Sequence, residues 1–214
     1  IVKEITSLSF VTFSRQGVVS ILAIILNHTL YTFGGEHSVT VYGIISRMLM
    51  FALFPVLGIT QAFLPIAGFN YGAKNYHRVK ETISVSIKYA AVLATLIFVV
   101  ILFFAKPIVS VFTTDQLVID ETPNALRWVF TASPIIAIQL IGAAYFQAAG
   151  KAKKALLLTL TKQGFFLIPL VLILPHFFGI LGVWIAFPIA NVLSTIITAI
   201  KKKKEMNENL IEST

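Results

Sequence analysis

The sequence predicts an all-α polytopic membrane protein that crosses the bilayer six times, and three observations lead to this prediction. Of the 214 residues, 57% are hydrophobic and only 12% are charged, which is about half the charged fraction of an average soluble domain. The apolar residues form runs long enough to cross a bilayer as helices, which takes about 20 residues each. Lys and Arg gather in alternate connections between these runs, as they do in membrane proteins.

The six predicted spans cover residues 5–33, 39–67, 83–105, 123–149, 155–174 and 180–200. Gly and Pro, which interrupt helices and form turns, lie in or beside the connections. The connection before Pro123 is long enough for a short helix on the membrane surface, with Asp120 and Glu121 placed as acids before a helix N-terminus. We take residues 1–204 as one transmembrane domain and residues 205–214 as a solvated cytoplasmic tail.

The basic residues predict the orientation, because cytoplasmic connections accumulate Lys and Arg. One side of the membrane receives the basic residues at positions 3, 74–80, 151–154 and 201–204. The other side receives Lys106 together with the acids at positions 36, 115, 120 and 121. We therefore expect a multi-pass protein of a bacterial cell membrane with both ends of this segment cytoplasmic. The net charge of +8 then reports topology and not nucleic-acid binding, because no soluble basic module is present.

Residues that would carry catalysis or bind a metal are not grouped in the sequence. There is no Cys, and the four His residues are scattered over different segments without the spacing of a metal site. We expect no enzyme activity, no cofactor and no metal. The first span begins within a few residues of Ile1, on the predicted cytoplasmic side, so we also expect the chain to be a fragment that lacks preceding spans.

One polar stretch interrupts the apolar chain, "PIAGFNYGAKNYHRVKE" at residues 65–81. Its glycines fit neither of the glycine-rich phosphate-binding fingerprints, because no Gly-Lys-Ser/Thr and no third spaced glycine follows them. It lies where the second span ends, and we expect Pro65 and Gly68 to loosen the helix there.

With its preceding residues, this stretch reads "GITQAFLPIAGFNYGAKNYHRVKE" and resembles the signature that ends the second helix of the C-terminal lobe in MATE transporters, the multidrug and toxic compound extrusion family. The stretches "YFQAAGKAKKALLLTLTKQGFFLIPLVLILP" and "FGILGVWIAFPIANVLS" are similar to the last three helices of that family. The matching signature residues are Pro65, Gly68, Asn70, Tyr71, Gly72, Ala73 and Gly150.

The resemblance implies a twelve-helix transporter built from two six-helix lobes, of which this chain would be the second. Members of the family export amphipathic drugs or toxic organic compounds in exchange for H⁺ or Na⁺. The implied partners are the N-terminal lobe of the same chain, membrane lipids and small-molecule substrates, with no nucleic acid. In some branches the C-terminal lobe carries coupling carboxylates, but every acid of this chain lies outside the predicted spans. We therefore expect the coupling ion to bind in the missing lobe.

Polar residues within the spans are the candidates for a substrate cavity. They are Arg15, Gln16, Ser20, Asn27, Arg47, Gln61, Gln139, Gln147, Lys162 and Asn191, and Gln163 belongs to the same group. Hydrogen bonding between helices is the alternative role for the uncharged members. The deep cations Arg15, Arg47 and Lys162 fit poorly with a cationic drug, so an anionic or zwitterionic substrate is a further alternative, whereas Lys88 and Arg127 lie near span ends and are expected to reach the interface.

Two other functions are compatible with the pattern. A flippase for lipid-linked sugars, from a related superfamily with a similar helix count, would use Arg15 and Arg47 for a pyrophosphate group. A helix bundle that serves as an assembly or anchoring subunit would need no substrate cavity. Prolines within the predicted spans, at positions 55, 134, 169 and 188, would bend their helices in a transporter that changes shape.

Overall fold

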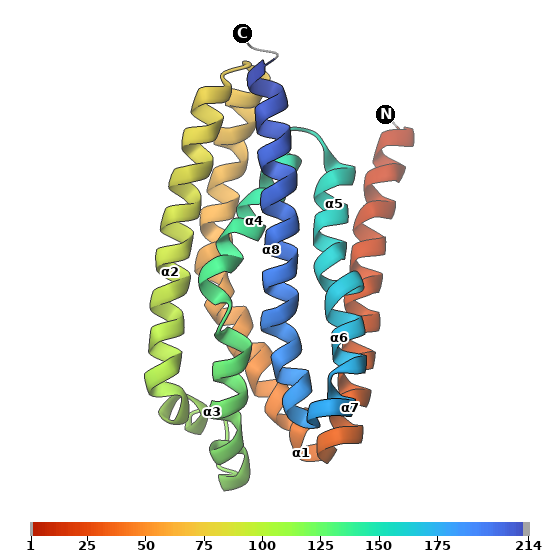
Figure 1. Cartoon of the computed structure of the whole chain (residues 1–214), viewed down its shortest axis with the longest axis vertical. Coiled ribbons are helices and arrows are strands. Elements are labelled where there is room, and N and C mark those ends of the chain that lie inside the picture. The colour runs from red at the N-terminus through yellow and green to blue at the C-terminus, as the bar shows by residue number, and fades with distance from the viewer. Residues whose placement is uncertain (1, 212–214) are drawn as a thin grey trace.

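The computed structural model describes the backbone of residues 2–211 and the side chains of residues 13, 16–151 and 153–208. This part of the chain is almost entirely helical and contains no strand. The elements are α1 (Val2–Gly72), α2 (Tyr76–Ser110), α3 (Gln116–Phe130), α4 (Ser133–Ala148), α5 (Ala152–Leu160), η1 (Thr161–Leu167), α6 (Ile168–Ile173), α7 (Pro175–Phe178) and α8 (Ile180–Ile211). The long axes run roughly alongside one another in one bundle (Figure 1).

Helix α1 crosses the bundle twice and turns at a single residue. Its described stretch Gln16–Gly72 has 57 residues, about 85 Å of helix against a bilayer core of roughly 30 Å. Gly35 interrupts it with φ 71° and ψ −173°, a region that essentially only glycine enters. We call residues 2–34 the first arm and residues 36–72 the second arm. The two arms meet in a V at one end of the molecule (Figure 1).

The fourth predicted span is broken into two helices. Helices α3 and α4 are bent by 48° at the short break between Phe130 and Ser133. Pro134 lies in the first turn of α4 and has no N–H to donate to the carbonyl of Phe130, which ends the helical ladder here. The predicted span over residues 123–149 is therefore formed by two helices bent at the expected proline, and the pair together is long and apolar enough for one span.

The same span also starts earlier than expected. Helix α3 begins at Gln116, and its N-terminus is capped by Asp115, whose Oδ1 accepts a hydrogen bond of 3.0 Å from the backbone N–H of Leu117. Asp120 and Glu121 thus lie within α3 and not ahead of a helix. The expected surface helix before Pro123 is the beginning of α3 itself, because Pro123 is tolerated inside the helix.

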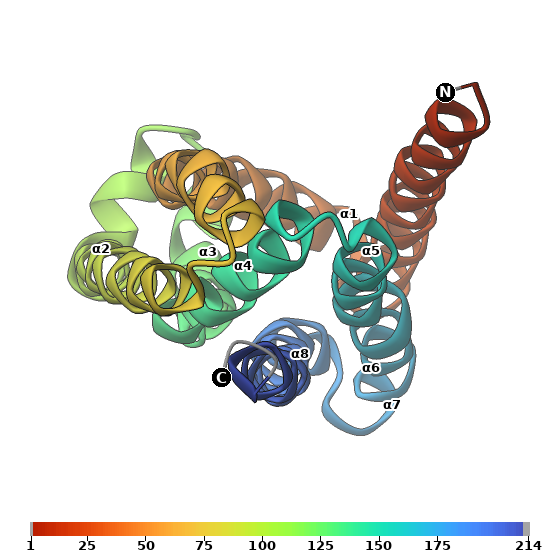
Figure 2. The ribbon, with the colours of Figure 1, turned by 90° about the horizontal axis from the view of Figure 1, so that it is seen from above.

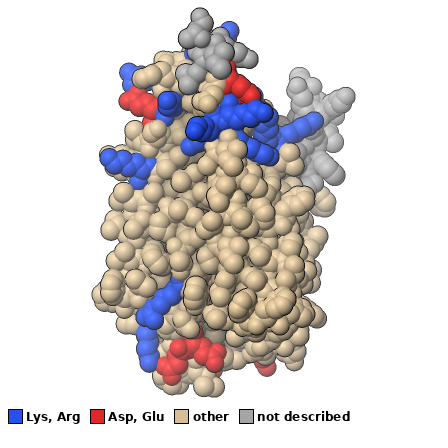
Figure 3. Space-filling view, viewed as in Figure 1, with Lys and Arg blue, Asp and Glu red and all other residues tan. Residues whose placement is uncertain are grey.

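Together, these helices make six passes. Four described helices are long and apolar enough to cross a membrane, the bent pair α3–α4 makes a further span, and α1 turns back at Gly35. The chain accordingly begins and ends at the same end of the bundle (Figure 1). Charged side chains gather at the two ends, and the middle of the face in Figure 3 carries none, which is the surface expected of a membrane protein.

The core is built where the arms of α1 meet the other helices. The largest apolar cluster includes Leu26 and Leu30 of the first arm, Ile45 of the second arm, Leu126 of α3 and Trp184 of α8. Seen along the bundle, the first arm lies beside α5 and α6, the second arm lies beside α2, α3 and α4, and α8 runs near the gap between these groups (Figure 2). The first arm with α5 and α6 forms one group of helices, and the second arm with α2, α3 and α4 forms another. The Gly35 turn and the α4–α5 connection join the two groups.

Two expectations about helix ends are wrong. The second arm stays helical through Gly68 to Gly72, because Pro65 removes only one backbone hydrogen bond and the rest of the ladder persists. The turn follows at residues 73–75, where Lys74 has a positive φ of 56°. At the other end, α8 continues to Ile211, so the start of the expected tail is helical, and Glu205 and Met206 are buried.

Candidate functional site

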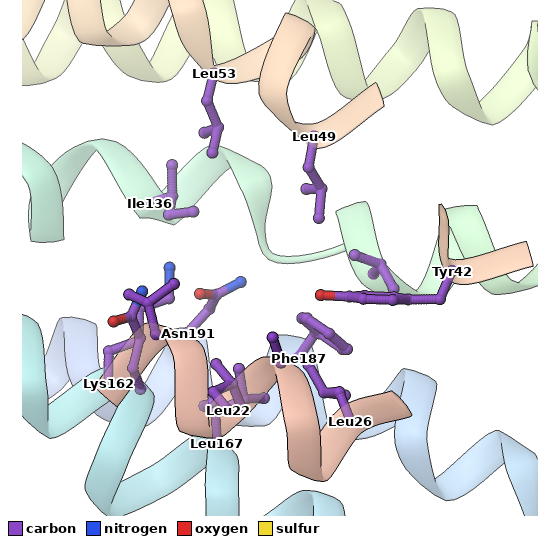
Figure 4. A pocket seen from close by; sticks show the side chains of 15 residues that line it. Leu22, Leu26, Tyr42, Leu49, Leu53, Ile136, Lys162, Leu167, Phe187 and Asn191 are labelled. Atoms are coloured by element: carbon purple, nitrogen blue, oxygen red, sulfur yellow. The ribbon is translucent and has the colours of Figure 1, made fainter. Parts of the chain in front are cut away.

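A cavity of about 240 Å³ lies inside the lobe, between both arms of α1, α3, α4, η1 and α8. Most of its wall is apolar. Leu22 and Leu26 come from the first arm, Leu49 and Leu53 from the second, and Phe187 from α8 (Figure 4). The volume is somewhat below the roughly 300–1,000 Å³ of pockets that enclose a drug-sized molecule. The cavity therefore suits part of a larger amphipathic molecule or a small one.

Three polar side chains interrupt this apolar wall, and two of them follow each other in η1. Lys162 and Gln163 line the cavity from η1, and Asn191 lines it from α8. Figure 4 shows Lys162 and Asn191 on one side of the cavity, across from Leu49, Leu53 and Ile136. A mainly apolar cavity with a few convergent polar groups is the usual form of a small-molecule site.

The position of Lys162 follows from the wide helical turn that carries it. The backbone N–H of Ile168 bonds the carbonyl of Gln163, five residues back, which is the π-helical pattern. Pro169 comes next and cannot donate to the carbonyl of Phe165, so the ordinary α pattern is interrupted at this point. Single π turns of this kind often occur at functional sites because they change where side chains point.

Lys162 has no hydrogen-bond or ion-pair partner among the residues whose side chains are described. It lies ten residues from the start of α5, which corresponds to about 15 Å of helix and to half the bilayer core. A cation near the bilayer centre costs roughly 2.5 to 3.5 kcal/mol on insertion scales. An unpaired Lys at this depth is thus a costly feature, which makes it a candidate for function.

The two amides of the cavity also lack partners. Gln163 Oε1 and Asn191 Oδ1 are buried without a hydrogen bond, and the Asn191 side chain is almost fully enclosed. Buried polar atoms are nearly always paired in folded proteins, so each exception needs an explanation. A ligand or water in the cavity would supply the missing bonds.

The structure brings together only some of the candidates from the sequence. Lys162 and Asn191 meet in the cavity with Gln163, and Tyr42 of the second arm joins them in the lining. Sequence reasoning missed Tyr42, because an aromatic residue in an apolar run gives no polar signal. Gln139 is buried with an unpaired Oε1, but it does not line this cavity.

The other candidates lie on the outside of the lobe. The exposed members are Gln16, Ser20 and Asn27 in the first arm, Arg47 and Gln61 in the second, and Gln147 in α4. The hydroxyl of Ser20 donates a bond of 3.1 Å to the carbonyl of Gln16, one turn earlier. The side chain of Arg15 lies outside the described residues. The six exposed members thus lie on the surface of this lobe and do not line the cavity described above.

The signature residues gather at the end of the bundle where α8 leaves the spans. Asn70 Nδ2 donates to the carbonyl of Ile66 at 2.8 Å, and the ring of Tyr71 packs edge-on against those of Tyr76 and Tyr145. Gly150, with φ 73°, makes the turn between α4 and α5. Their visible role here is to close the helix ends and not to contact the cavity.

Next to Tyr71, a buried carboxylate holds two lysines. Glu205 of α8 accepts hydrogen bonds from Lys151 and from Lys154, the second at 2.6 Å. The Lys151 ammonium also lies 5.9 Å from the centre of the Tyr71 ring. Hydrogen bonding to Glu205 raises the pKa of Lys151 above its ordinary range. This cluster ties the α4–α5 connection to α8.

Among the described residues, no group of three or more His, Asp or Glu side chains is arranged to hold a metal ion. The groups that the cavity offers are one ammonium, two amides and one phenol. Such a set can bind and orient a ligand, and it contains no nucleophile paired with a base.

Comparison with known proteins agrees with this geometry. Residues 13–173 match the MatE family. The multidrug export protein MepA of Staphylococcus haemolyticus is 26% identical over 181 residues, which cover 85% of this chain and 39% of that protein. The FAD transporter of Shewanella oneidensis is 27% identical over 162 residues, covering 75% of this chain and 36% of that protein.

The fold is also that of a solved transporter lobe. The structure of a multidrug resistance MATE family transporter of the MOP superfamily, in an inward-facing conformation, superposes with a TM-score of 0.93 at 25% identity. The match covers 100% of this chain and 50% of that one. The chain thus spans half of the solved transporter and about 40% of the curated relatives. It belongs to the MatE family of membrane transporters, in which it corresponds to one six-span lobe.

Proposed function

We propose that this chain is the second lobe of a transporter that exports amphipathic drugs or toxic organic compounds by alternating access between two lobes. The observation that carries the proposal is the cavity with Lys162, Gln163 and Asn191, because it places unpaired polar groups inside the membrane-spanning part of a MatE lobe. A bundle that serves only as an anchor has no need for such costly groups. The partner of this lobe is the other half of the same protein.

The transporter is an antiporter whose coupling ion, H⁺ or Na⁺, binds in the other lobe. The support is chemical: every Asp and Glu of this chain lies outside the predicted spans, and neutral amides cannot carry a proton between states. Both ends of the segment are cytoplasmic in this proposal, and its support is the positive residues near each end.

The substrate class differs among the relatives, since one is named a multidrug export protein and another an FAD transporter. Both kinds of compound therefore belong in the first test. The full-length protein would be reconstituted in proteoliposomes loaded with ethidium or with FAD, and release of each compound would be followed by fluorescence. A proton gradient and a sodium gradient would be imposed in separate experiments.

Gradient-dependent movement of either compound supports an antiporter and identifies its ion. If a correctly folded protein moves neither compound under either gradient, the proposal of a coupled exporter for such substrates is wrong. Movement that persists after all membrane carboxylates of the other lobe are neutralised would contradict the assignment of the coupling ion to that lobe.

A further inference from the structure

We propose that the cavity inside this lobe binds the anionic group of an amphipathic substrate, with Lys162 as its cationic ligand and Gln163 and Asn191 as hydrogen-bonding ligands. The inference rests on the proposed transport function and assigns a substrate class to it. It begins with the charge of Lys162. An ammonium at this depth is stable only if an anion or strong hydrogen-bond acceptors neutralise it.

No carboxylate of this lobe can fill that role. Among the described side chains, the acids are at positions 36, 81, 115, 120, 121, 205 and 208, and none of them lines the cavity. Of the remaining two, Glu4 precedes Val18 by fourteen residues, or about 21 Å of helix, and Val18 is the residue that packs against Gly164 next to Gln163. Glu212 follows the last span. An anion that pairs with Lys162 in this cavity is therefore not one of the described carboxylates of this lobe.

The cavity is lined by this lobe but is open on one side, where Ala23 is exposed and Lys162 is only partly buried. Its walls come from both arms of α1, from α3 and α4, from η1 and from α8. A diffusible anion can reach Lys162 through this open side without crossing the packed helices. Rocking of the two lobes during alternating access would expose the opening to one side of the membrane and then to the other.

The remaining walls define the rest of the ligand. Asn191 is 7% exposed, and neither its Oδ1 nor the Oε1 of Gln163 has a hydrogen-bond partner among the described residues. The N–H groups of each amide can donate to an oxyanion that Lys162 neutralises, and the two unpaired amide oxygens can accept hydrogen bonds from a hydroxyl or N–H group of the same ligand or from water. Leu22, Leu49 and Phe187 then face an apolar body. A volume of about 240 Å³ is several times the roughly 30 Å³ of a water molecule, which is more than an inorganic ion needs.

The test measures binding directly, so that it does not depend on transport. Purified full-length transporter in detergent would be titrated with tritiated naphthalene-2-sulfonate, which is a permanent anion with a flat apolar body, in a scintillation proximity assay. The neutral naphthalene-2-sulfonamide would be titrated as its uncharged match. We expect saturable binding of the sulfonate that Lys162→Met weakens by at least about 10-fold, because a charge-assisted hydrogen bond is lost. Binding of the sulfonamide should change by less than about 2-fold, since it carries no charge for Lys162 to neutralise.

Three further variants complete the test. Lys162→Arg keeps the charge and should retain most of the binding, and Asn191→Leu should weaken the sulfonate selectively without removing any charge. Lys88→Met removes an exposed lysine of α2 and should change nothing. Equal affinity of wild type and Lys162→Met for the sulfonate, or no saturable binding by wild type, would overturn the proposal and would favour a carboxylate of the other lobe as the partner of Lys162.

The binding assay tests the anion site and the transport assay tests coupled export, so a negative result in one does not decide the other. If the protein exports ethidium under a gradient but the sulfonate does not bind, the anion site is wrong and the proposed antiporter stands. If the sulfonate binds through Lys162 but no gradient drives movement of ethidium or FAD, the site stands and the proposed coupled export is wrong.

Discussion

Lys154 Nζ lies 2.6 Å from Glu205 Oε2, although the two residues are 51 positions apart in the sequence. The pair joins the start of α5 to the part of α8 that extends beyond the predicted span. Lys151, in the α4–α5 connection, binds the other oxygen of the same carboxylate, so one buried acid pairs with two lysines on either side of the start of α5. The end of the bundle is therefore closed by charge as well as by apolar packing.

Replacing Glu205 by Gln should lower the stability of the transporter. The substitution leaves two lysines without their acid, which costs about 1–2 kcal/mol after allowance for the partial exposure of both lysines. The midpoint of thermal unfolding of the full-length protein in detergent would measure this loss. Glu208→Gln is the matched control, because Glu208 is exposed and lies 4.0 Å from Lys204. Equal unfolding midpoints for the two variants would contradict the role given to Glu205.

Replacing Gly35 by Ala should strain the turn between the two arms of α1. A Cβ at φ 71° and ψ −173° costs about 1–3 kcal/mol, even though no neighbouring atom lies within 4 Å of it. We expect a lower unfolding midpoint and a lower yield of folded protein. In Gly58→Ala, a helical position with equally open surroundings, the added methyl group should leave stability unchanged or raise it. A Gly35→Ala protein as stable as Gly58→Ala would show that the turn tolerates a side chain.

Replacing Gly182 by Ala should separate α8 from the end of the preceding span. An added Cβ would lie 2.5 Å from the backbone carbonyl carbon and oxygen of Leu174, and backbone atoms cannot turn away as a side chain can. We expect a cost of about 1–3 kcal/mol from overpacking. Gly43→Ala, which meets nothing within 4 Å, is the control. The clash would be disproved by similar unfolding midpoints for the two variants.

The proposed orientation predicts which ends of the bundle an impermeant thiol reagent can reach. This chain contains no Cys, so single cysteines can be introduced into it at Asn207 in α8 and at Thr114 in the α2–α3 connection, both exposed positions. In intact cells, a membrane-impermeant maleimide should label Thr114→Cys and leave Asn207→Cys unlabelled until the cells are opened. The reverse pattern would invert the topology inferred from the basic residues. Any native Cys in the other lobe would first be replaced.

Much of the fold could be predicted from hydropathy and charge. Apolar runs of sufficient length must lie in the membrane, and the alternation of basic residues assigns the connections to its two sides. A bend at Pro134 was expected from the sequence, but a complete break before Ser133 was not, because a proline bends a helix or ends it according to what packs around it. The buried position of Glu205 was hidden for a related reason. Its neighbours in the sequence are hydrophilic, and only the packing of α8 against the α4–α5 connection reveals its partners.

The candidate site was predicted in part. Lys162 and Asn191 stand out as polar residues in apolar runs, but their meeting in one cavity depends on how η1 faces α8. Exposure could not be read from the sequence either, since Gln16, Ser20 and Asn27 share a helix face that turns away from the core of this lobe. Tyr42 gave no signal, because a phenol differs from the apolar residues around it by a single oxygen.

The single-residue turn at Gly35 has a practical consequence for handling the protein. Between the first and second spans almost no chain projects from the bundle, so an antibody fragment, a protease or an inserted epitope would find no loop there. The connection between α2 and α3, at residues 111–115, lies towards the same end of the molecule (Figure 1). It is the place where a fusion partner or a fiducial domain for electron microscopy would be inserted on that face.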